Sequence, residues 1–155
     1  MPVMEKALRW LNDQKIPFEV NALSAHRTPE AVEDFAKNAQ SRGIKVIIAG
    51  AGMAAALPGV IAASTNLPVI GVPIKGMLDG LDAMLSIIQM PPGIPVATVG
   101  VNAGQNAAIL AAQIIALSDP EVARKVAEWK ATLGNKIEKA NRDLAQIKDY
   151  EYKCN

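Results

Sequence analysis

Cysteine and histidine are almost absent from this sequence. The 155 residues include one cysteine, Cys154, and one histidine, His26. A single cysteine cannot form an intramolecular disulfide, and one cysteine with one histidine cannot supply the usual ligands of a zinc site. The sequence therefore predicts a chain without a metal centre, of a kind typical of the reducing cytoplasm.

Aromatic residues, excess charge and long apolar runs are also scarce. Aromatic residues make up 4% of the chain, and the formal net charge is +1. Such a chain offers neither a stacking platform for single-stranded bases nor a field that attracts nucleic acid or anionic membranes. The apolar stretches are too interrupted to span a bilayer, and the first eleven residues lack the apolar region of a signal peptide. We therefore expect a cytoplasmic protein with neither nucleic acid nor a membrane as a partner.

Apolar residues of small or β-branched type are abundant instead, and half of the chain is hydrophobic. Four short runs of them alternate with helix-like segments, at Phe18–Ala22, Lys45–Ala49, Pro68–Val72 and Pro95–Val99. Continuous apolar runs are typical of strands buried on both faces of a parallel sheet, and this alternation indicates βαβ units. The sequence therefore predicts the α/β class with a parallel sheet.

The end of the chain reads as a long helix. A capping box from Ser118 to Glu121 predicts a helix that begins at Pro120 and continues beyond Arg142. We expect one domain over residues 1–155, with a core over about 1–117 and a C-terminal helix and tail over about 118–155. A long terminal helix is suited to packing on a neighbouring subunit, so we expect a homo-oligomer.

The turn after the first apolar run carries the strongest chemical signal. Ligands of open parallel sheets bind beyond the carboxyl ends of the strands. His26 and Arg27 lie in such a turn, just before Thr28 and Pro29, which are typical of a helix start. A histidine can accept and donate a proton near neutrality, and an arginine presents a fork for phosphate or carboxylate. The alternative is a loop histidine bonded to the backbone beside a surface arginine.

The turns after the other runs carry weaker signals. The small residues from Gly50 to Gly59 allow a ligand to approach the backbone, but they also favour tight helix–sheet packing. Lys75 could reach an anionic group, whereas Asp79 and Asn102 are expected to cap the helices that follow them. The sequence contains neither a P-loop, nor a GxGxxG fingerprint, nor a GxSxG elbow. A cofactor-free reaction with one proton shuttle is compatible with this inventory.

Taken together, these segments resemble the aminoimidazole ribonucleotide carboxylase/mutase family, known as PurE. The residues from Ser24 to Pro29 match its SAHRTP signature, and Ile48 to Gly59 resemble its IAGAGGAAHLPG segment. Further matches are Leu67–Pro73 with LPVIGVP, Leu78–Asp82 with LNGLD, Leu85–Pro91 with LSIVQMP and Pro95–Val99 with PVATV. The resemblance extends from about Pro2 to Leu117, and the motifs are specific as a set.

The resemblance implies a flavodoxin-like three-layer sandwich that assembles as an octamer. It implies conversion of N5-carboxyaminoimidazole ribonucleotide to 4-carboxyaminoimidazole ribonucleotide in purine biosynthesis, through carbon dioxide and without metal or organic cofactor. His26 corresponds to the family's general acid and base. The substrate-binding positions that the resemblance implies are Ser24, Ala25, Arg27, Ala51, Gly52 and Leu57.

Two departures from the family pattern stand out. The family begins with a strand and a GSxSD turn, and the resemblance here starts immediately after that turn. Ala56 occupies the place of the histidine in the AHLPG segment. Without the first strand, we expect either that a neighbouring subunit completes the sheet or that the fold is perturbed.

Other functions compete with the mutase reaction. The first is direct carboxylation of aminoimidazole ribonucleotide by carbon dioxide, and the second is a catalytically impaired, ligand-binding homologue. The residues from Gly52 to Pro58 also echo the AGMxxALP loop of a family that carboxylates a nicotinate nucleotide. The SAHRTP and QMP segments favour the aminoimidazole family over that one.

Overall fold

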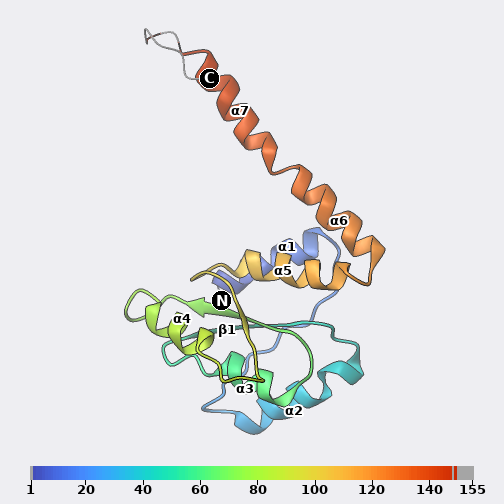
Figure 1. The fold of residues 1–155 in the computed structure, drawn as a ribbon, viewed down its shortest axis with the longest axis vertical. Helices are drawn as coiled ribbons and strands as arrows, with labels where there is room; N and C mark the ends of the chain where they lie inside the picture. Colours follow the sequence, from blue (N-terminus) through green and yellow to red (C-terminus); the bar gives the residue numbers. More distant parts are fainter. Residues whose placement is uncertain (1, 148, 150–155) are drawn as a thin grey trace.

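The fold is built on a parallel sheet flanked by helices, as the sequence predicts. A computed structural model describes residues 2–147 and 149. Strands β1 (Ile47–Gly52), β2 (Val69–Ile74) and β3 (Ala97–Thr98) lie in the order β1-β2-β3, with Ile47 opposite Val69 and Ile70 opposite Ala97. Helices cover both faces of this sheet (Figure 1). The arrangement is the three-layer, flavodoxin-like sandwich that was expected.

The helices are divided between the two faces. Helices α1 (Pro2–Asp13) and α5 (Gly104–Ala116) cover one face, above the sheet in Figure 1. The other face carries α2 (Pro29–Ala39), the short 3-10 helix η1 (Gln40–Arg42), α3 (Leu57–Ser64) and α4 (Leu81–Ile88). Strand β2 explains this division, because its side chains point alternately to the two layers and all but the last are buried. Ile70 and Val72 pack toward Ala107 and Ala111 of α5, while Val69 joins the cluster of α2 and α3.

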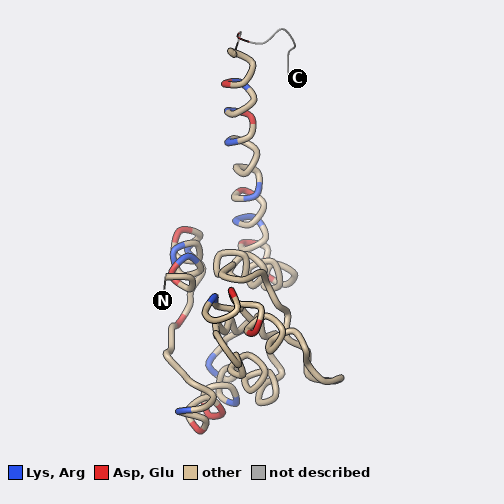
Figure 2. The backbone as a smooth tube through the Cα atoms, turned by 90° about the vertical axis from the view of Figure 1, so that its left-hand side faces the viewer, with Lys and Arg blue, Asp and Glu red and all other residues tan. Residues whose placement is uncertain are grey.

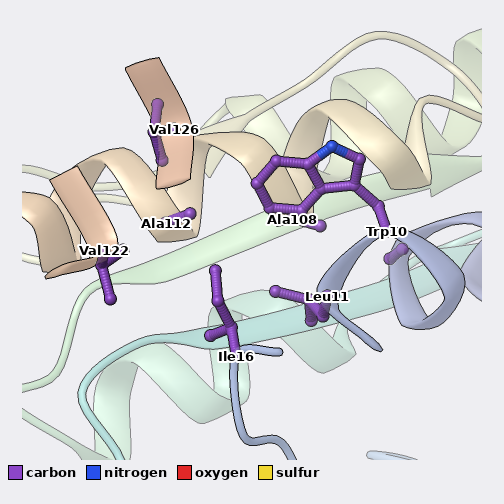
Figure 3. Packing of buried hydrophobic residues seen from close by; sticks show 8 residues of the cluster. Trp10, Leu11, Ile16, Ala108, Ala112, Val122 and Val126 are labelled. Atoms are coloured by element: carbon purple, nitrogen blue, oxygen red, sulfur yellow. The ribbon is translucent and has the colours of Figure 1, made fainter. Parts of the chain in front are cut away.

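A cluster around Trp10 joins the first helix to the end of the chain. Trp10 is 5% exposed and packs with Leu11, Ile16, Ala108, Ala112, Val122 and Val126 (Figure 3). Its ring meets that of Trp129 edge to face, with centroids 5.4 Å apart. Helix α6 (Pro120–Ala131) is thereby anchored to α1 and α5.

The predicted strand over Phe18–Ala22 does not form. Residues 16–24 are irregular, and within the described chain no backbone hydrogen bond involves residues 17–23. Phe18 and Val20 are 45% and 54% exposed, so the apolar pattern of a strand is present without a partner strand. The physical reason is that a strand is stabilised by its ladder, and among residues 2–147 the strand β1 pairs with β2 alone.

The C-terminal helix is present, but it is divided in two. Helix α6 ends at Ala131 and α7 (Gly134–Ala145) follows, projecting away from the sheet (Figures 1 and 2). The break has a local cause: the Thr132 hydroxyl donates to the Trp129 carbonyl, and Gly134 has low helix propensity. Asp119, rather than Ser118, caps α6, because its carboxylate accepts the amide hydrogens of Glu121 and Val122.

No helix in residues 2–147 is both long enough and apolar enough to cross a membrane. Cys154, which the sequence places in a tail, lies outside the described residues.

Candidate active site

The turn that carries His26 is closed by bonds between Ser24 and Thr28. The Thr28 amide donates to the Ser24 carbonyl at 2.8 Å, and the Ser24 amide donates to the Thr28 hydroxyl oxygen at 3.0 Å. The Thr28 hydroxyl in turn donates to the Ser24 carbonyl, so it does not cap α2 as the sequence suggested. Pro29 begins α2 directly after the turn. The five residues from Ser24 to Thr28 are thus folded into a compact loop with His26 at its middle.

His26 and Arg27 are both exposed at this turn. Within residues 2–147, neither the imidazole nor the guanidinium group has a hydrogen-bond or ion-pair partner, and the Arg27 amide alone is held, by Ser24. The alternative of a histidine bonded to the backbone is therefore not what the structure contains. Both side chains can meet a ligand without first breaking a contact.

The loop after β1 brings backbone close to the same rim. Ala51 and Gly52 end β1, and Met53 and Ala55 adopt positive φ angles of 53° and 31°. Helix α3 then begins at Leu57, with Pro58 in its first turn and Ala56 at its N-cap. Ala56, which stands where the family has a histidine, is thus the residue directly before the N-terminus of α3. Free backbone amides at a helix N-terminus favour an anion.

The two turns lie on the same edge of the molecule. Helices α2 and α3 pack together through Val32 and Ile61, and the same cluster includes Leu23 and Leu57. Leu23 adjoins Ser24, so the His26 turn and the start of α3 are both attached to this cluster, beyond the carboxyl end of β1. Ser24, Ala25, Ala51, Gly52 and Leu57 are all half-buried there. The structure therefore gathers the candidate residues at one rim of the sheet.

The loop after β2 differs from what the sequence predicted. Asp79 does not cap α4, since Gly80 is the N-cap and no side chain bonds there. Instead, the Asp79 carboxylate lies 2.7 Å from the Lys75 ammonium group, and Asp79 has a φ of 55°. An aspartate in this left-handed conformation ends the loop, and its charge is satisfied by the lysine rather than by helix amides.

Asn102 is likewise not a helix cap. Ala103 is the N-cap of α5, and the Asn102 side-chain oxygen accepts the amide hydrogen of Lys75 at 2.9 Å. This tie joins residues far apart in the sequence, so no local pattern could have indicated it. An asparagine after a strand, followed by a helix, predicts a cap by default.

Two hollows lie at the opposite end of the sheet. One, of about 740 Å³, is lined by residues around the starts of β2 and β3, among them Lys37, Asn66, Val69 and Pro95. A second, of about 400 Å³, adjoins Gly43 and Lys45 before β1. Neither includes His26, Arg27 or the loop after β1. His26 and Arg27 instead lie exposed at the carboxyl rim of the sheet.

Comparisons with known proteins identify the family of this chain. A sequence model of the AIR carboxylase family, described as AIR carboxylase, matches residues 1–136. The N5-carboxyaminoimidazole ribonucleotide mutase of Thermotoga maritima is 53% identical over 154 residues, which cover 98% of this chain and 90% of that protein. The phosphoribosylaminoimidazole carboxylase of Saccharomyces cerevisiae is 52% identical over 130 residues, covering 83% of this chain and 23% of the yeast protein.

A solved structure shows the same fold. The crystal structure of Treponema denticola PurE superposes with a TM-score of 0.84 at 30% sequence identity, covering 94% of this chain and 92% of that one. On these similarities of sequence and structure, the chain belongs to the AIR carboxylase family.

Proposed function

We propose that this chain converts N5-carboxyaminoimidazole ribonucleotide to 4-carboxyaminoimidazole ribonucleotide, a step of purine biosynthesis, in the cytoplasm. The observation that carries the proposal is the 53% identity to a mutase over 98% of the chain. It is supported by a lone histidine exposed on the ligand side of a parallel sheet. In this proposal, residues 1–155 act as one domain.

His26 is the proton shuttle in the proposed reaction. When the nitrogen–carboxyl bond breaks, carbon dioxide leaves and the nitrogen takes a proton from the imidazolium of His26. The ring carbon C4 then attacks the carbon dioxide, and the neutral imidazole removes the C4 proton. The cycle balances, because the proton given in the first half returns in the second. An imidazole can both donate and accept a proton, which suits both halves.

The neighbouring residues hold the substrate and the gas. Arg27 adjoins the histidine and supplies a planar cation for the substrate phosphate. Ser24 and Ala25 present backbone groups to the substrate from the same turn. Ala51, Gly52 and Leu57, from the loop after β1, cover the substrate's imidazole ring and its carboxylate. Carbon dioxide kept between these walls reacts at high effective concentration, so no carrier cofactor is needed.

The test is the variant His26→Asn, assayed with N5-carboxyaminoimidazole ribonucleotide. We expect turnover to fall by at least ~10²-fold, because the proton transfers lose their catalyst, with an unchanged circular dichroism spectrum and melting temperature. Gln40→Ala is the matched control, since Gln40 is exposed beside the hollow at the other end of the sheet. Retained activity in His26→Asn would refute the assignment.

The same assay separates the competing functions. Turnover with aminoimidazole ribonucleotide and bicarbonate, but not with the carboxyamino compound, would favour direct carboxylation. The yeast relative carries a carboxylase name, which keeps this second candidate in view. Binding of the ribonucleotide without turnover would identify an impaired homologue, and Ala56→His would then be the first substitution to restore activity.

We also propose that the chain forms a homo-octamer. Exposed apolar side chains line one face of α4, where Leu81, Leu85 and Ile88 are 51%, 47% and 54% exposed. A second stripe runs along α7 at Leu133, Ile137, Leu144 and Ile147. Surfaces of this kind mark contacts with other chains. The exposed His26 and Arg27 support the same proposal, because a neighbouring subunit could enclose them.

Light scattering on the purified protein tests this assembly. An octamer has eight times the 16.4 kDa mass of the chain. The double variant Leu85→Glu with Ile137→Glu is expected to lower that mass, because charges cannot be buried in an apolar contact. A monomeric wild-type protein would contradict the proposal.

A further inference from the structure

Residues with strained backbone gather at the carboxyl rim of the sheet. In the described chain, the non-glycine residues with positive φ are Met53 and Ala55 after β1, Leu78 and Asp79 after β2, and Asn102 after β3, with Lys15 the exception at the end of α1. For residues other than glycine, asparagine and aspartate, this conformation is costly and persists only when surrounding contacts hold it. The rim must therefore contain the contacts that keep these turns in place.

Asn102 makes two such contacts with the end of β2. Its backbone amide donates to the Pro73 carbonyl at 2.8 Å, and its side-chain oxygen accepts the Lys75 amide hydrogen at 2.9 Å. Strand β3 ends at Thr98, so these bonds extend the pairing of β2 beyond the last strand residue. Asparagine is one of the few residues that visits the left-handed region readily. The side chain thus fixes the backbone of Lys75.

The loop that starts at Lys75 is held at its other end as well. A Cβ placed on Gly80 would lie 2.7 Å from Cγ1 of Val101 and 3.2 Å from Cα of Lys75. Val101 precedes Asn102, so consecutive residues of the β3–α5 turn contact both ends of the β2–α4 loop. The loop from Lys75 to Gly80 is clamped against that turn.

This clamped loop contacts the loop proposed to cover the substrate. A Cβ on Gly52 would lie 3.2 Å from the carbonyl oxygen of Ile74, and a Cβ on Gly76 would lie 4.0 Å from Cγ of Met53. Gly52 is one of the proposed substrate-binding residues. Displacement of Ile74 to Gly76 would therefore remove the support beneath Gly52 and Met53.

We propose that Asn102 is a positioning residue, which holds the substrate-covering loop after β1 in place through the β2–α4 loop. The proposal rests on the proposed function for its kinetic consequence, but the hydrogen bond itself can be tested without it. Asn102 does not reach the reacting atoms. It sets the fraction of molecules in which the binding loop is already ordered.

Three variants test the proposal. Asn102→Gly keeps the positive φ and removes the acceptor, whereas Asn102→Asp keeps an acceptor oxygen at the same place. Lys15→Gly is the matched control, because Lys15 has a φ of 52° far from the rim. If the loop is ordered in only a fraction of the molecules, the apparent affinity for the substrate is reduced in proportion to that fraction. We expect Asn102→Gly to raise KM for the carboxyamino substrate about 10-fold and to change kcat less than KM.

The conservative variant should restore most of the loss. We expect Asn102→Asp to stay within about threefold of the wild-type KM, since the hydrogen bond to the Lys75 amide is kept. Lys15→Gly should leave both constants unchanged. An unaltered KM in folded Asn102→Gly would overturn the proposal, as would an Asp variant as impaired as the Gly variant.

Hydrogen exchange at the Lys75 amide provides a readout that does not depend on turnover. We expect this amide to be protected in the wild-type protein and to exchange at least ~10-fold faster in Asn102→Gly, because its acceptor is gone. A wild-type Lys75 amide that exchanges like a free amide overturns the clamp. If the wild type is inactive on both ribonucleotides, the proposed function fails while this measurement still decides the clamp, and calorimetric titration with aminoimidazole ribonucleotide replaces KM.

Discussion

The two sides of the candidate rim are held by different means. On one side, the turns after β1, β2 and β3 contact each other, with Asn102 bonded to Lys75 and Gly76 against Met53. On the other, the His26 turn is closed by bonds within itself, and the segment leading to it is tied by an exposed ion pair between Glu19 and Arg42, 2.8 Å apart. The difference indicates that the loop proposed to cover the substrate is supported by the sheet, whereas the proposed proton shuttle lies on a peripheral turn.

The largest effect is expected from Gly80→Ala, which disturbs the side of the rim where the turns after β1, β2 and β3 contact each other. A left-handed conformation costs a non-glycine residue about 1–2 kcal/mol, and the clash with Val101 adds about 1–3 kcal/mol of overpacking. We expect the free energy of unfolding, measured by urea titration, to fall by the sum of these two terms. Gly43→Ala is the control, because Gly43 has a φ of 86° and nothing within 4 Å of the added Cβ. Equal losses in the two variants would mean that the contact with Val101 is not tight.

A smaller effect is expected from Thr28→Val, which disturbs the other side of the rim, the His26 turn. The substitution keeps the shape of the side chain and removes its bonds to Ser24, at a cost of about 1 kcal/mol. We expect kcat to fall severalfold, because His26 loses its fixed position, while urea denaturation shows only the small loss of stability. In Thr65→Val, which removes a similar bond to the Leu67 amide, stability should fall and kcat should not. An unaltered kcat in Thr28→Val would show that the turn does not position the imidazole.

The smallest effect concerns α2, which begins beside the His26 turn. A hydrogen bond from the Lys37 ammonium group, followed by its charge, lowers the pKa of the Glu33 carboxyl below its ordinary value. The pair therefore adds stability above the unfolded pKa of the carboxyl, and this contribution is lost as the pH falls through the lower, folded pKa. Both groups are exposed, so Glu33→Gln should change the melting temperature little at pH 7 and not at all in strong acid. A large change at pH 7, relative to Glu30→Gln, would contradict the surface character of this pair.

Most of the fold follows from the sequence, because the apolar runs after Phe18–Ala22 do form the parallel strands β1, β2 and β3. The burial expected of these runs is complete only in β2, whereas β1 is partly buried and β3 is a two-residue strand with Ala97 exposed. Phe18 and Val20 carry the same pattern without forming a strand, because the pattern reports side-chain burial while the strand itself requires a partner on its edge. The sequence alone therefore overestimates the sheet by one strand.

The candidate site likewise has features that the sequence predicts and features that it does not. His26 and the small residues after β1 are visible in the sequence as short motifs, and the structure brings their turns to one rim. The sequence did not predict the hydrogen bond between the Asn102 side chain and the Lys75 amide, or the ion pair between Asp79 and Lys75. Both depend on the path of a loop, which the hydrophobic pattern of the sequence does not describe. Capping preferences are local averages, and here the pairing of β2 with the β3–α5 turn overrides them.

The turn between α6 and α7 also has a mechanical consequence. Thr132, Leu133 and Asn135 are connected there by hydrogen bonds to residues three positions earlier, which are weaker than those of a continuous helix. Val122 and Val126 remain fixed in the Trp10 cluster on one side of this joint. We therefore expect α7 to bend relative to α6 at this turn more readily than either helix bends within itself, while α6 stays anchored to α1 and α5.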